Sequence, residues 1–282
     1  MTTVATITES VRNAELALGR HSESPRLDAE LLLATLLGLP RSALIARGNE
    51  PVALHDERAY AELIARRAHG VPIAYLTGRR EFWSLPLQVS PAVLVPRPET
   101  EILVEQALAL LPRDAVCSAL DLGTGSGAIA LSLAHERPRW AITAVDVSAA
   151  ALDVARQNAH DLKLSHIQWR LGHWFDPVPA ERFHLIVANP PYIAANDPAL
   201  TALYAEPAAA LIAGPTGLEA LSAIIARAPG HLHARGWLVL EHGISQGQDV
   251  AQLLQAQGFD SIRTYSDLSG RPRVTLGVHN QH

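Results

Sequence analysis

An asparagine, two prolines and a tyrosine come directly after an apolar run, residues 183–188, that is typical of a buried strand. Neither Pro190 nor Pro191 can donate to a strand ladder, so the pair ends the strand. The oxygen of Asn189 and a proline carbonyl are hydrogen-bond acceptors, and Tyr192 adds a flat ring. The segment is either a plain chain turn or part of a site that orients an amino or amide group.

A glycine-rich turn is the second candidate site. In "ALDLGTGSGAIALSLA" a strand pattern leads into the turn, and a helix pattern follows it. Glycine permits a tight turn and close approach of the backbone to a ligand, and the first turn of the helix presents free N–H groups. The turn residues are Gly123, Thr124, Gly125, Ser126 and Gly127.

Asp146 ends the apolar stretch "AITAVD", about twenty residues beyond the turn. An acidic side chain at this place binds ribose hydroxyls in nucleotide-binding sheets, although it could instead cap the next helix. The turn departs from the G-x-G-x-x-G dinucleotide pattern and lacks the Lys-Ser/Thr ending of a phosphate loop. A nucleoside with a short amino-acid tail, S-adenosylmethionine, fits these features better than a pyrophosphate.

Composition sets the broad class. The chain has 282 residues, 48% of them hydrophobic, which supports real cores and more than one domain. Its net charge of −5 gives no overall attraction to nucleic acid or anionic membranes. Its single cysteine, Cys117, suits a reducing compartment, and neither a membrane span nor a signal peptide is recognisable. We therefore expect a soluble cytoplasmic protein.

The first part of the chain has a helical pattern. Pro25 follows the candidate cap Ser24, and apolar residues recur at helical spacing until Gly38. These apolar residues are Leu27, Leu31, Ala34 and Leu37. Residues 40–46 and 56–68 give two further helices. We expect residues 1–77 to form a small helical bundle for substrate recognition.

Residues 78–97 are expected to form a β-hairpin linker, because "REFWSLPLQVS" alternates apolar and polar residues. In "VLVPRPETE" the chain returns to helix, with Pro98 in the first turn. Glu99 and Glu101 suit the positive end of the helix dipole, and they have either this capping role or a direct functional contact.

Residues 98–282 are expected to form an α/β catalytic domain with a Rossmann-like, mostly parallel, doubly wound sheet of seven strands, with helices separating the first five. The predicted strands are Ser118–Leu122, Ala141–Asp146, Ile167–Leu171, His184–Ala188, Gly236–Glu241, Ser261–Tyr265 and Val274–Val278. Because Asn189 follows the fourth strand, it should lie at the same sheet edge as the glycine turn.

The ordered set of motifs resembles the PrmC/HemK family of class I S-adenosylmethionine-dependent methyltransferases, which methylate the N5 of a glutamine in class 1 peptide chain release factors. The motifs are "EFW", "VLVPRPETE", "DLGTGSGAIA", "AVDVS", "LIVANPPYI", "AEPAAAL", "LEHG" and "DLSGRPRV". The resemblance implies that the glycine turn wraps the methionine part of the cofactor and that Asp146 holds its ribose. It implies an adenine contact for Trp174, which could otherwise be a core aromatic.

One position departs from the family. His173 precedes Trp174, where the family usually has an acidic residue. A contact from that position to the adenine amino group must therefore change in this chain. Glu206 and Glu241 also match family positions, and helix capping or loop positioning is the default interpretation of both.

A glutamine amide is a poor nucleophile, because its nitrogen lone pair is delocalised into the carbonyl. The Asn189 oxygen and the Pro190 carbonyl can each accept one N–H and leave the lone pair aimed at the methyl group. Tyr192 can pack on the flat amide, and Pro191 completes the substrate-binding segment. The methyl-transfer step needs neither a general base nor a metal ion. The thirteen histidines, including His231 and His233, are interpreted as a solvated surface.

Two other functions remain open. NPPY-type segments also orient the exocyclic amine of adenine in nucleic acids, although the acidic charge and the lack of a basic reading surface speak against it. The chain could also bind S-adenosylmethionine as a sensor without catalysis. An intact glycine turn beside an intact NPPY segment favours an enzyme over a sensor, and the helical first part and the PRPETE segment favour a protein substrate. The resemblance implies that this substrate is a release factor, and we expect no contact to nucleic acid or membrane.

Overall fold

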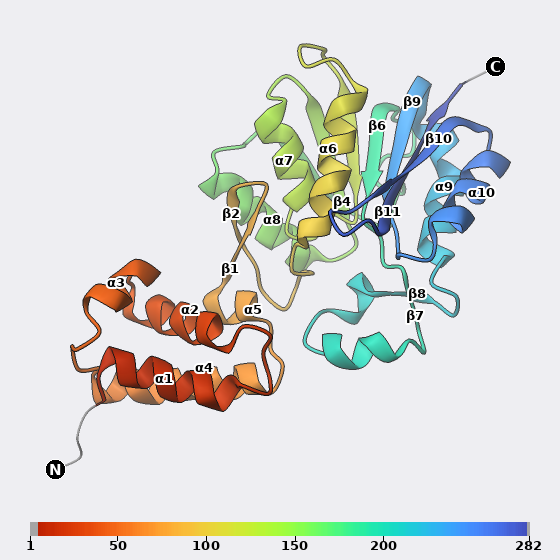
Figure 1. The fold of residues 1–282 in the computed structure, drawn as a ribbon. Helices are drawn as coiled ribbons and strands as arrows, with labels where there is room; N and C mark the ends of the chain where they lie inside the picture. The colour runs from red at the N-terminus through yellow and green to blue at the C-terminus, as the bar shows by residue number, and fades with distance from the viewer. Residues whose placement is uncertain (1–4, 281–282) are drawn as a thin grey trace. The chain divides into compact units, whose positions relative to one another are not determined.

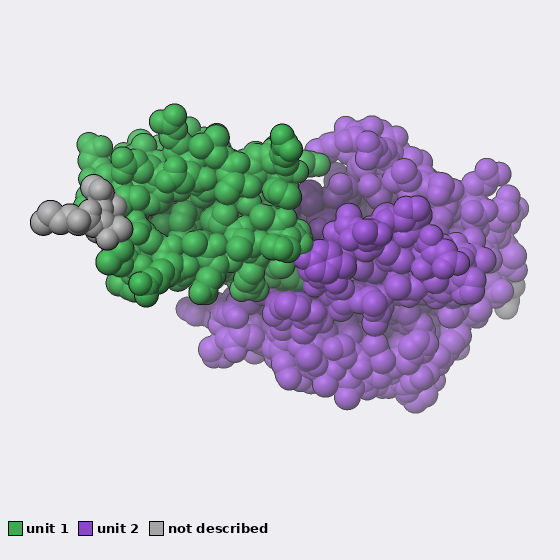
Figure 2. Space-filling model, turned by 90° about the horizontal axis from the view of Figure 1, so that it is seen from below, with its two compact units in different colours: residues 1–79 green, residues 80–282 purple. Residues whose placement is uncertain are grey.

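The computed structural model describes residues 5–280 and is drawn in Figure 1. The chain folds as two compact units, Met1–Arg79 and Arg80–His282, coloured separately in Figure 2. The finer division into segments 1–77, 78–97 and 98–282 stays a prediction.

The first unit is a bundle of helices. Its elements are α1 (Ile7–Leu18), α2 (Pro25–Leu37), α3 (Arg41–Ala46), α4 (Leu54–Ala68) and α5 (Ile73–Thr77). Apolar side chains of α1, α2 and α4 form its core, and the buried Tyr60 hydroxyl donates to the Ala29 carbonyl at 2.9 Å. The helices predicted at residues 40–46 and 56–68 are α3 and α4.

Helix α2 is present, but its buried face differs from the predicted stripe. Ala29, Leu32 and Leu33 are fully buried, whereas Leu27 is exposed. Apolar residues occupy every position from 31 to 34, so helical spacing alone fits more than one face. Ser24 occupies the N-cap position, but its side chain makes no capping hydrogen bond.

The predicted hairpin is present. It consists of β1 (Arg79–Phe82) and β2 (Leu85–Gln88), joined by Trp83 and Ser84 with φ of 52° and 58°. After a loop, the short 3-10 helix η1 (Pro98–Thr100) leads into α6 (Glu101–Leu110), so the helix begins where Pro98 predicts. Glu101 accepts a hydrogen bond from the Trp83 amide at 2.8 Å, which ties α6 to the hairpin.

The second unit is built on a seven-stranded sheet of order β10-β11-β9-β6-β3-β4-β5, in which only β11 pairs antiparallel with its neighbours. Its strands are β3 (Ser118–Leu122), β4 (Ala141–Asp146), β5 (Ile167–Leu171), β6 (Phe183–Ala188), β9 (Leu232–Glu241), β10 (Phe259–Ser266) and β11 (Pro272–His279). All seven predicted strands are present, and the first three have the predicted bounds. The predicted α/β fold class is confirmed.

The expectation of a helix in each of the first four connections was wrong at one place. Helix α7 (Ala128–Glu136) follows β3, α8 (Ala149–Asp161) follows β4, and α9 (Glu219–His231) precedes β9, but β5 and β6 are joined by residues 172–182 without a helix. This connection contains Gly172, Pro177 and Pro179 in eleven residues, and such a composition does not sustain a helix.

Both faces of the sheet are covered, as a mostly parallel sheet requires. Alternating residues of β6 show this: Leu185 and Val187 pack with α6 and α7, whereas Ile186 and Ala188 pack with α9 and α10 (Gly247–Ala256). Figure 1 shows α6 and α7 on one side of the strands and α9 and α10 on the other.

The strand order reverses between β3 and β6, because β4 and β5 lie to one side of β3 and β6 lies to the other. Ligands of open α/β sheets bind beyond the carboxyl ends of the strands at such a switch point. Residues 189–218, which follow β6, carry the short strands β7 (Ile193–Ala194) and β8 (Ile212–Gly214) with 3-10 helices η2 (Pro198–Leu203) and η3 (Ala208–Ala210). The strand order therefore brings the glycine turn, Asp146 and Asn189 together at the carboxyl edge of the sheet.

Candidate active site

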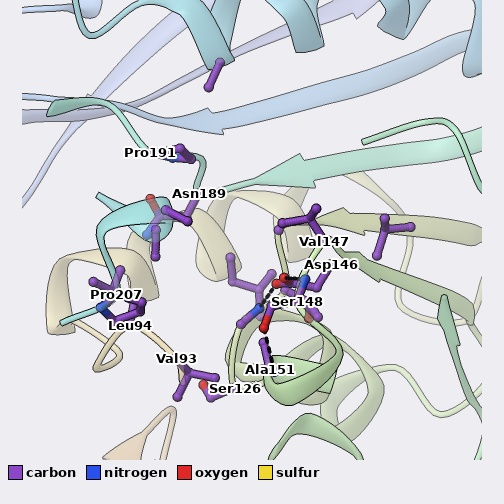
Figure 3. A pocket seen from close by; sticks show the side chains of 18 of the residues that line it. Val93, Leu94, Ser126, Asp146, Val147, Ser148, Ala151, Asn189, Pro191 and Pro207 are labelled. Carbon is purple, nitrogen blue, oxygen red and sulfur yellow. Dashed lines mark hydrogen bonds between the residues drawn. The ribbon is translucent and has the colours of Figure 1, made fainter. Parts of the chain in front are cut away.

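A cavity of about 580 Å³ lies at this edge, within the second unit. Its lining includes Gly123, Thr124, Gly125, Ser126, Asp146, Trp174, Asn189 and Pro191. In Figure 3, Asp146 and Ser148 lie on one side of the cavity, Leu94 and Pro207 lie opposite, and Asn189 and Pro191 enter from the end of β6. Most of the residues predicted from sequence thus share one cavity.

The glycine turn has a backbone conformation that glycine favours, and backbone hydrogen bonds fix it. Gly123 and Gly125 have φ of 73° and 56°, in the left-handed region that glycine adopts readily. The amides of Gly123 and Thr124 donate to the Val145 carbonyl at 2.8 and 3.0 Å. A Cβ on Gly123 would lie 3.3 Å from the Trp174 ring, so this ring occupies the space that a side chain would need.

Gly127 has a different place. It is the N-cap of α7 with φ of 83°, and it is not among the cavity-lining residues. A Cβ there would lie 3.0–3.2 Å from Leu131, Ala155 and Trp169. In this structure Gly127 allows close packing of α7 rather than direct exposure to the cavity.

Asp146 bridges the turn and the next helix. Its Oδ2 accepts from the Gly125 amide at 2.8 Å and its Oδ1 from the Ser148 amide at 2.9 Å. Ser148, not Asp146, is the N-cap of α8, and its hydroxyl accepts from the Ala151 amide (Figure 3). Each carboxylate oxygen keeps a further lone pair, so Asp146 can accept from ligand hydroxyls while it holds the turn.

Trp174 and His173 both line the cavity. Their rings lie 5.1 Å apart with 54° between the planes. Trp174 is half-buried; it packs against the core beneath α9 and α10 and also forms part of the cavity wall. His173 is exposed, and no carboxylate stands in its place.

The NPPY segment lies where the large cavity meets a small one. The small cavity, of about 70 Å³, is lined by Leu94, Arg97, Asn189, Tyr192, Ile193, Leu203, Ala210 and Leu211. Asn189 lines both cavities, Tyr192 only the small one, and Pro190 is buried outside either lining. The Asn189 Nδ2 donates to Oγ1 of Thr100 at 3.2 Å.

Glu241 is a buried carboxyl behind this segment. It is 1% exposed, and burial raises its pKa to about 7. The Tyr192 hydroxyl donates to Glu241 Oε1 at 3.4 Å, and desolvation together with Glu241 raises the pKa of that phenol. Neither Thr100 nor the link from Tyr192 to Glu241 was predicted from the sequence.

A second carboxyl, Glu206, holds the loop before η1. It is buried, pairs with the Arg97 guanidinium and accepts from the Val95 amide at 3.0 Å. Glu206 therefore positions a loop and caps no helix. Three residues of the PRPET segment, Pro96, Arg97 and Thr100, line the large cavity. The segment therefore both starts a helix and forms part of the cavity wall. In the sequence, the alternation of prolines with charged residues was the feature that could have indicated this role.

Other candidate features carry little chemistry. Within residues 5–280 there is no group of three or more His, Cys, Asp or Glu side chains arranged to hold a metal ion. Across the same part of the chain, no helix is both long and apolar enough to cross a membrane. Cys117 is buried, and burial raises the pKa of its thiol, which disfavours the nucleophilic thiolate.

The residues present fit S-adenosylmethionine. The cavity is large enough for a nucleoside with an amino-acid tail, the glycines let a ligand approach the backbone of the turn closely, and Asp146 supplies spare acceptors at the position where a ribose is held. The half-buried ring of Trp174 provides a flat apolar wall.

Known proteins resemble this chain in sequence and in fold. Residues 9–78 match the family model of the PrmC N-terminal domain, and residues 99–216 match that of the methyltransferase small domain. Solved structures with low sequence identity share the fold. A methyltransferase from Pyrococcus furiosus is 18% identical with a TM-score of 0.54, covering 70% of this chain and 90% of its own. The T. thermophilus 16S rRNA methyltransferase, solved with AdoMet and guanosine, is 18% identical with a TM-score of 0.56, covering 72% and 50%.

Curated relatives are far more similar. The release factor glutamine methyltransferase of Xylella fastidiosa (strain Temecula1) is 50% identical over 89% of this chain and 92% of its own. Those of Pseudomonas aeruginosa and Escherichia coli are 47% and 45% identical over 98% and 92% of this chain, and over 99% and 94% of their own. The predicted resemblance is confirmed, and this chain belongs to the family of release factor glutamine methyltransferases.

Proposed function

We propose that this protein transfers a methyl group from S-adenosylmethionine to the side-chain nitrogen, N5, of the glutamine in the Gly-Gly-Gln motif of class 1 peptide chain release factors. One observation carries the proposal most directly. Asn189 lines both the large and the small cavity, and its Nδ2 is committed to Thr100. Its Oδ1 is therefore available as an acceptor at the junction of the two cavities.

When bound, S-adenosylmethionine supplies a methyl group on a positively charged sulfur, and the carbon–sulfur electron pair stays on sulfur as the methyl leaves. The backbone of the glycine turn would lie against the methionine part of the cofactor, and the carboxylate of Asp146 would accept from its ribose hydroxyls. The ring of Trp174 would cover its adenine. We assign these roles to Gly123, Thr124, Gly125, Ser126, Asp146 and Trp174, with Gly127 shaping the turn from behind.

The acceptor glutamine would enter the small cavity. Asn189 Oδ1 would accept one of its N–H groups. The Pro190 carbonyl is the proposed acceptor of the other, although Pro190 lines neither cavity, and together they would turn the nitrogen lone pair toward the methyl group. Pro191 stiffens the segment, and the Tyr192 ring lies against the flat amide. The nitrogen becomes cationic as its bond to carbon forms, and it then loses a proton to water. Such positioning supplies up to roughly 7–11 kcal/mol of barrier reduction.

The test is mass spectrometry of a release factor incubated with the protein and S-adenosylmethionine. We expect a gain of one methyl group on the peptide with the Gly-Gly-Gln motif and none on DNA or RNA offered as alternative acceptors. Cell fractionation would test the cytoplasmic location that this substrate implies. Methylation of a nucleic acid, or cofactor binding without transfer to release factor, would contradict the proposal.

Asn189→Ala isolates the transfer step. We expect it to lower the methylation rate by about 100-fold or more, because one of two acceptors is lost and the amide is misplaced. Asn196→Ala, on an exposed position of the same loop, is the matched control. Calorimetry should show similar cofactor affinity in both variants. An Asn189→Ala enzyme as fast as the control would refute the assigned role.

A further inference from the structure

The carboxyl of Glu241, at the end of β9, is incompletely satisfied. It is 1% exposed, its Oε1 accepts from Tyr192 at 3.4 Å, and its Oε2 makes no hydrogen bond of standard geometry to the described residues. A buried carboxyl with so few partners lowers stability, so its place behind the NPPY segment points to another role.

Thr100 connects this carboxyl to Asn189. The threonine side chain is buried, and its Oγ1 accepts from Asn189 Nδ2 at 3.2 Å. The same hydroxyl lies beside Glu241 and offsets part of the rise in pKa that burial gives this carboxyl. A hydroxyl has a single proton, so a proton directed at Glu241 leaves Thr100 only lone pairs for Asn189. Asn189 must then present its NH2 group to Thr100 and turn its oxygen away.

We infer that Glu241 is a positioning residue that orients both polar side chains of the NPPY segment, Asn189 through Thr100 and Tyr192 directly. The inference rests on the proposed function, because the direction of the Asn189 amide matters only if its oxygen receives an N–H of the acceptor glutamine. Glu241 itself lines neither cavity, so it acts through the other residues.

The protonation state of Glu241 decides this orientation. Ionised Glu241 can only accept, so it fixes the direction of the Thr100 hydroxyl. A protonated Glu241 can donate to Thr100, which frees the threonine proton for the oxygen of Asn189 and permits the reversed amide. Burial favours the protonated form, and Glu99 does the same, whereas Arg273 favours the ionised form. Burial and Glu241 raise the pKa of the Tyr192 phenol, and Arg273 and Arg97 offset part of this rise.

A pair of substitutions at Thr100 gives the sharpest test. Thr100→Val keeps the shape and removes the hydroxyl, and we expect kcat for release-factor methylation to fall about 10–100-fold with little change in KM. Thr100→Ser keeps the hydroxyl and loses the methyl, and should restore most of that rate. A packing role predicts the reverse order, with serine the more damaging substitution. Thr143, which is also 4% exposed but lies on β4 outside both cavities, gives matched Val and Ser controls.

Glu241→Gln tests the positioning role of Glu241 itself. In wild type, kcat should rise with pH through about 7, as Glu241 ionises. The variant should be about tenfold slower above that pH and should lack this rise, because glutamine can donate to Thr100 at every pH. A pH profile in the variant equal to that of wild type would overturn the inference.

An observation without turnover completes the test. The side-chain NH2 signals of Asn189 in the cofactor-free protein, identified by their loss in Asn189→Asp, should shift in Thr100→Val and in Glu241→Gln but not in Thr143→Val. If wild type fails to methylate release factor, the proposed function fails. If wild type methylates it while Thr100→Val matches the Thr143 control in rate and in NH2 signals, only the positioning inference fails.

Discussion

The side-chain amide of Asn189 donates to the hydroxyl of Thr100 at 3.2 Å, across 89 positions of sequence. One partner follows β6 and the other ends η1, just before α6. The bond joins the segment proposed to hold the acceptor to the helix start that lines the same cavity. Since Thr100 is buried and Asn189 is half-buried, the amide is held in place from behind while its other end faces the cavities.

Gly125→Ala should weaken cofactor binding more than its effect on folding explains. Gly125 has φ of 56°, and no atom lies within 4 Å of the position that a Cβ would take, so the change adds backbone strain of about 1–2 kcal/mol and a methyl group at the cavity. Gly258→Ala has the same strain and open space away from the cavity. Thermal unfolding should shift similarly in both, whereas calorimetry should show weaker S-adenosylmethionine binding only in Gly125→Ala. Equal affinity in the two variants would contradict a close approach of Gly125 to the cofactor.

Asp146→Asn should raise the dissociation constant for S-adenosylmethionine by roughly 10–100-fold, because a hydrogen bond to a charged group contributes about 1.5–3 kcal/mol. The substitution keeps the size of the side chain and one acceptor oxygen. Asp153→Asn, on the exposed surface of α8, is the control and should bind like wild type. Unchanged affinity in Asp146→Asn would contradict a contact to the cofactor and would leave Asp146 only a structural role through Gly125 and Ser148.

Glu206→Gln should lower the free energy of unfolding by about 1–3 kcal/mol, since the buried Glu206 carboxylate pairs with Arg97 and accepts from the Val95 amide. Arg97 is one-third exposed, so solvent screens part of this pairing. Glu181→Gln breaks a pair with Arg170 in which the carboxylate is 41% exposed, and should cost under about 1 kcal/mol. Urea unfolding measures both values. Equal losses would show that burial does not strengthen the Glu206 pair.

The pH dependence of stability should reveal Glu241. Its pKa is raised by burial from 4.5 in the unfolded chain to about 7 in the folded protein, so the folded state holds a proton that the unfolded state releases. This carboxyl therefore favours folding most below pH 4.5, and its contribution is lost as the pH rises toward 7. The slope is at most about 1.4 kcal/mol per pH unit.

Other groups overlay this slope. The pKa of buried Asp121 is raised to about 7 by the same cause, whereas burial lowers the pKa of His184, His231 and His242, whose contribution has the opposite sign. The measurement is thus the difference in urea-unfolding free energy between wild type and Glu241→Gln. We expect this difference to fall between pH 4.5 and 7. A difference independent of pH would show that Glu241 titrates at its ordinary value.

Local patterns in the sequence were enough for the elements and for the candidate residues. The strands β3, β4 and β5 have the predicted bounds, because Gly123 and Gly172 directly follow β3 and β5, and the polar Asp146 ends β4. The glycine turn and the end of β6 were equally readable, since a turn that needs glycine and a strand that ends at proline depend on adjacent residues. The motifs also indicated the family that the relatives confirm.

Contacts between distant segments depended on the tertiary structure. Thr100 meets Asn189, Glu206 meets Arg97, and Tyr192 meets Glu241 only because the strand order places β6 beside β3 and β9 and brings residues 92–100 to the same edge. The helix-free link between β5 and β6 could have been predicted from its own glycine and prolines. The buried face of α2, in contrast, was missed because it depends on distant contacts. A single helix with apolar residues on several sides does not specify its partner, and only packing against α1 and α4 selects the buried face. The sequence by itself determined which side chains carry the chemistry, and the tertiary structure decided which buried groups hold them in place.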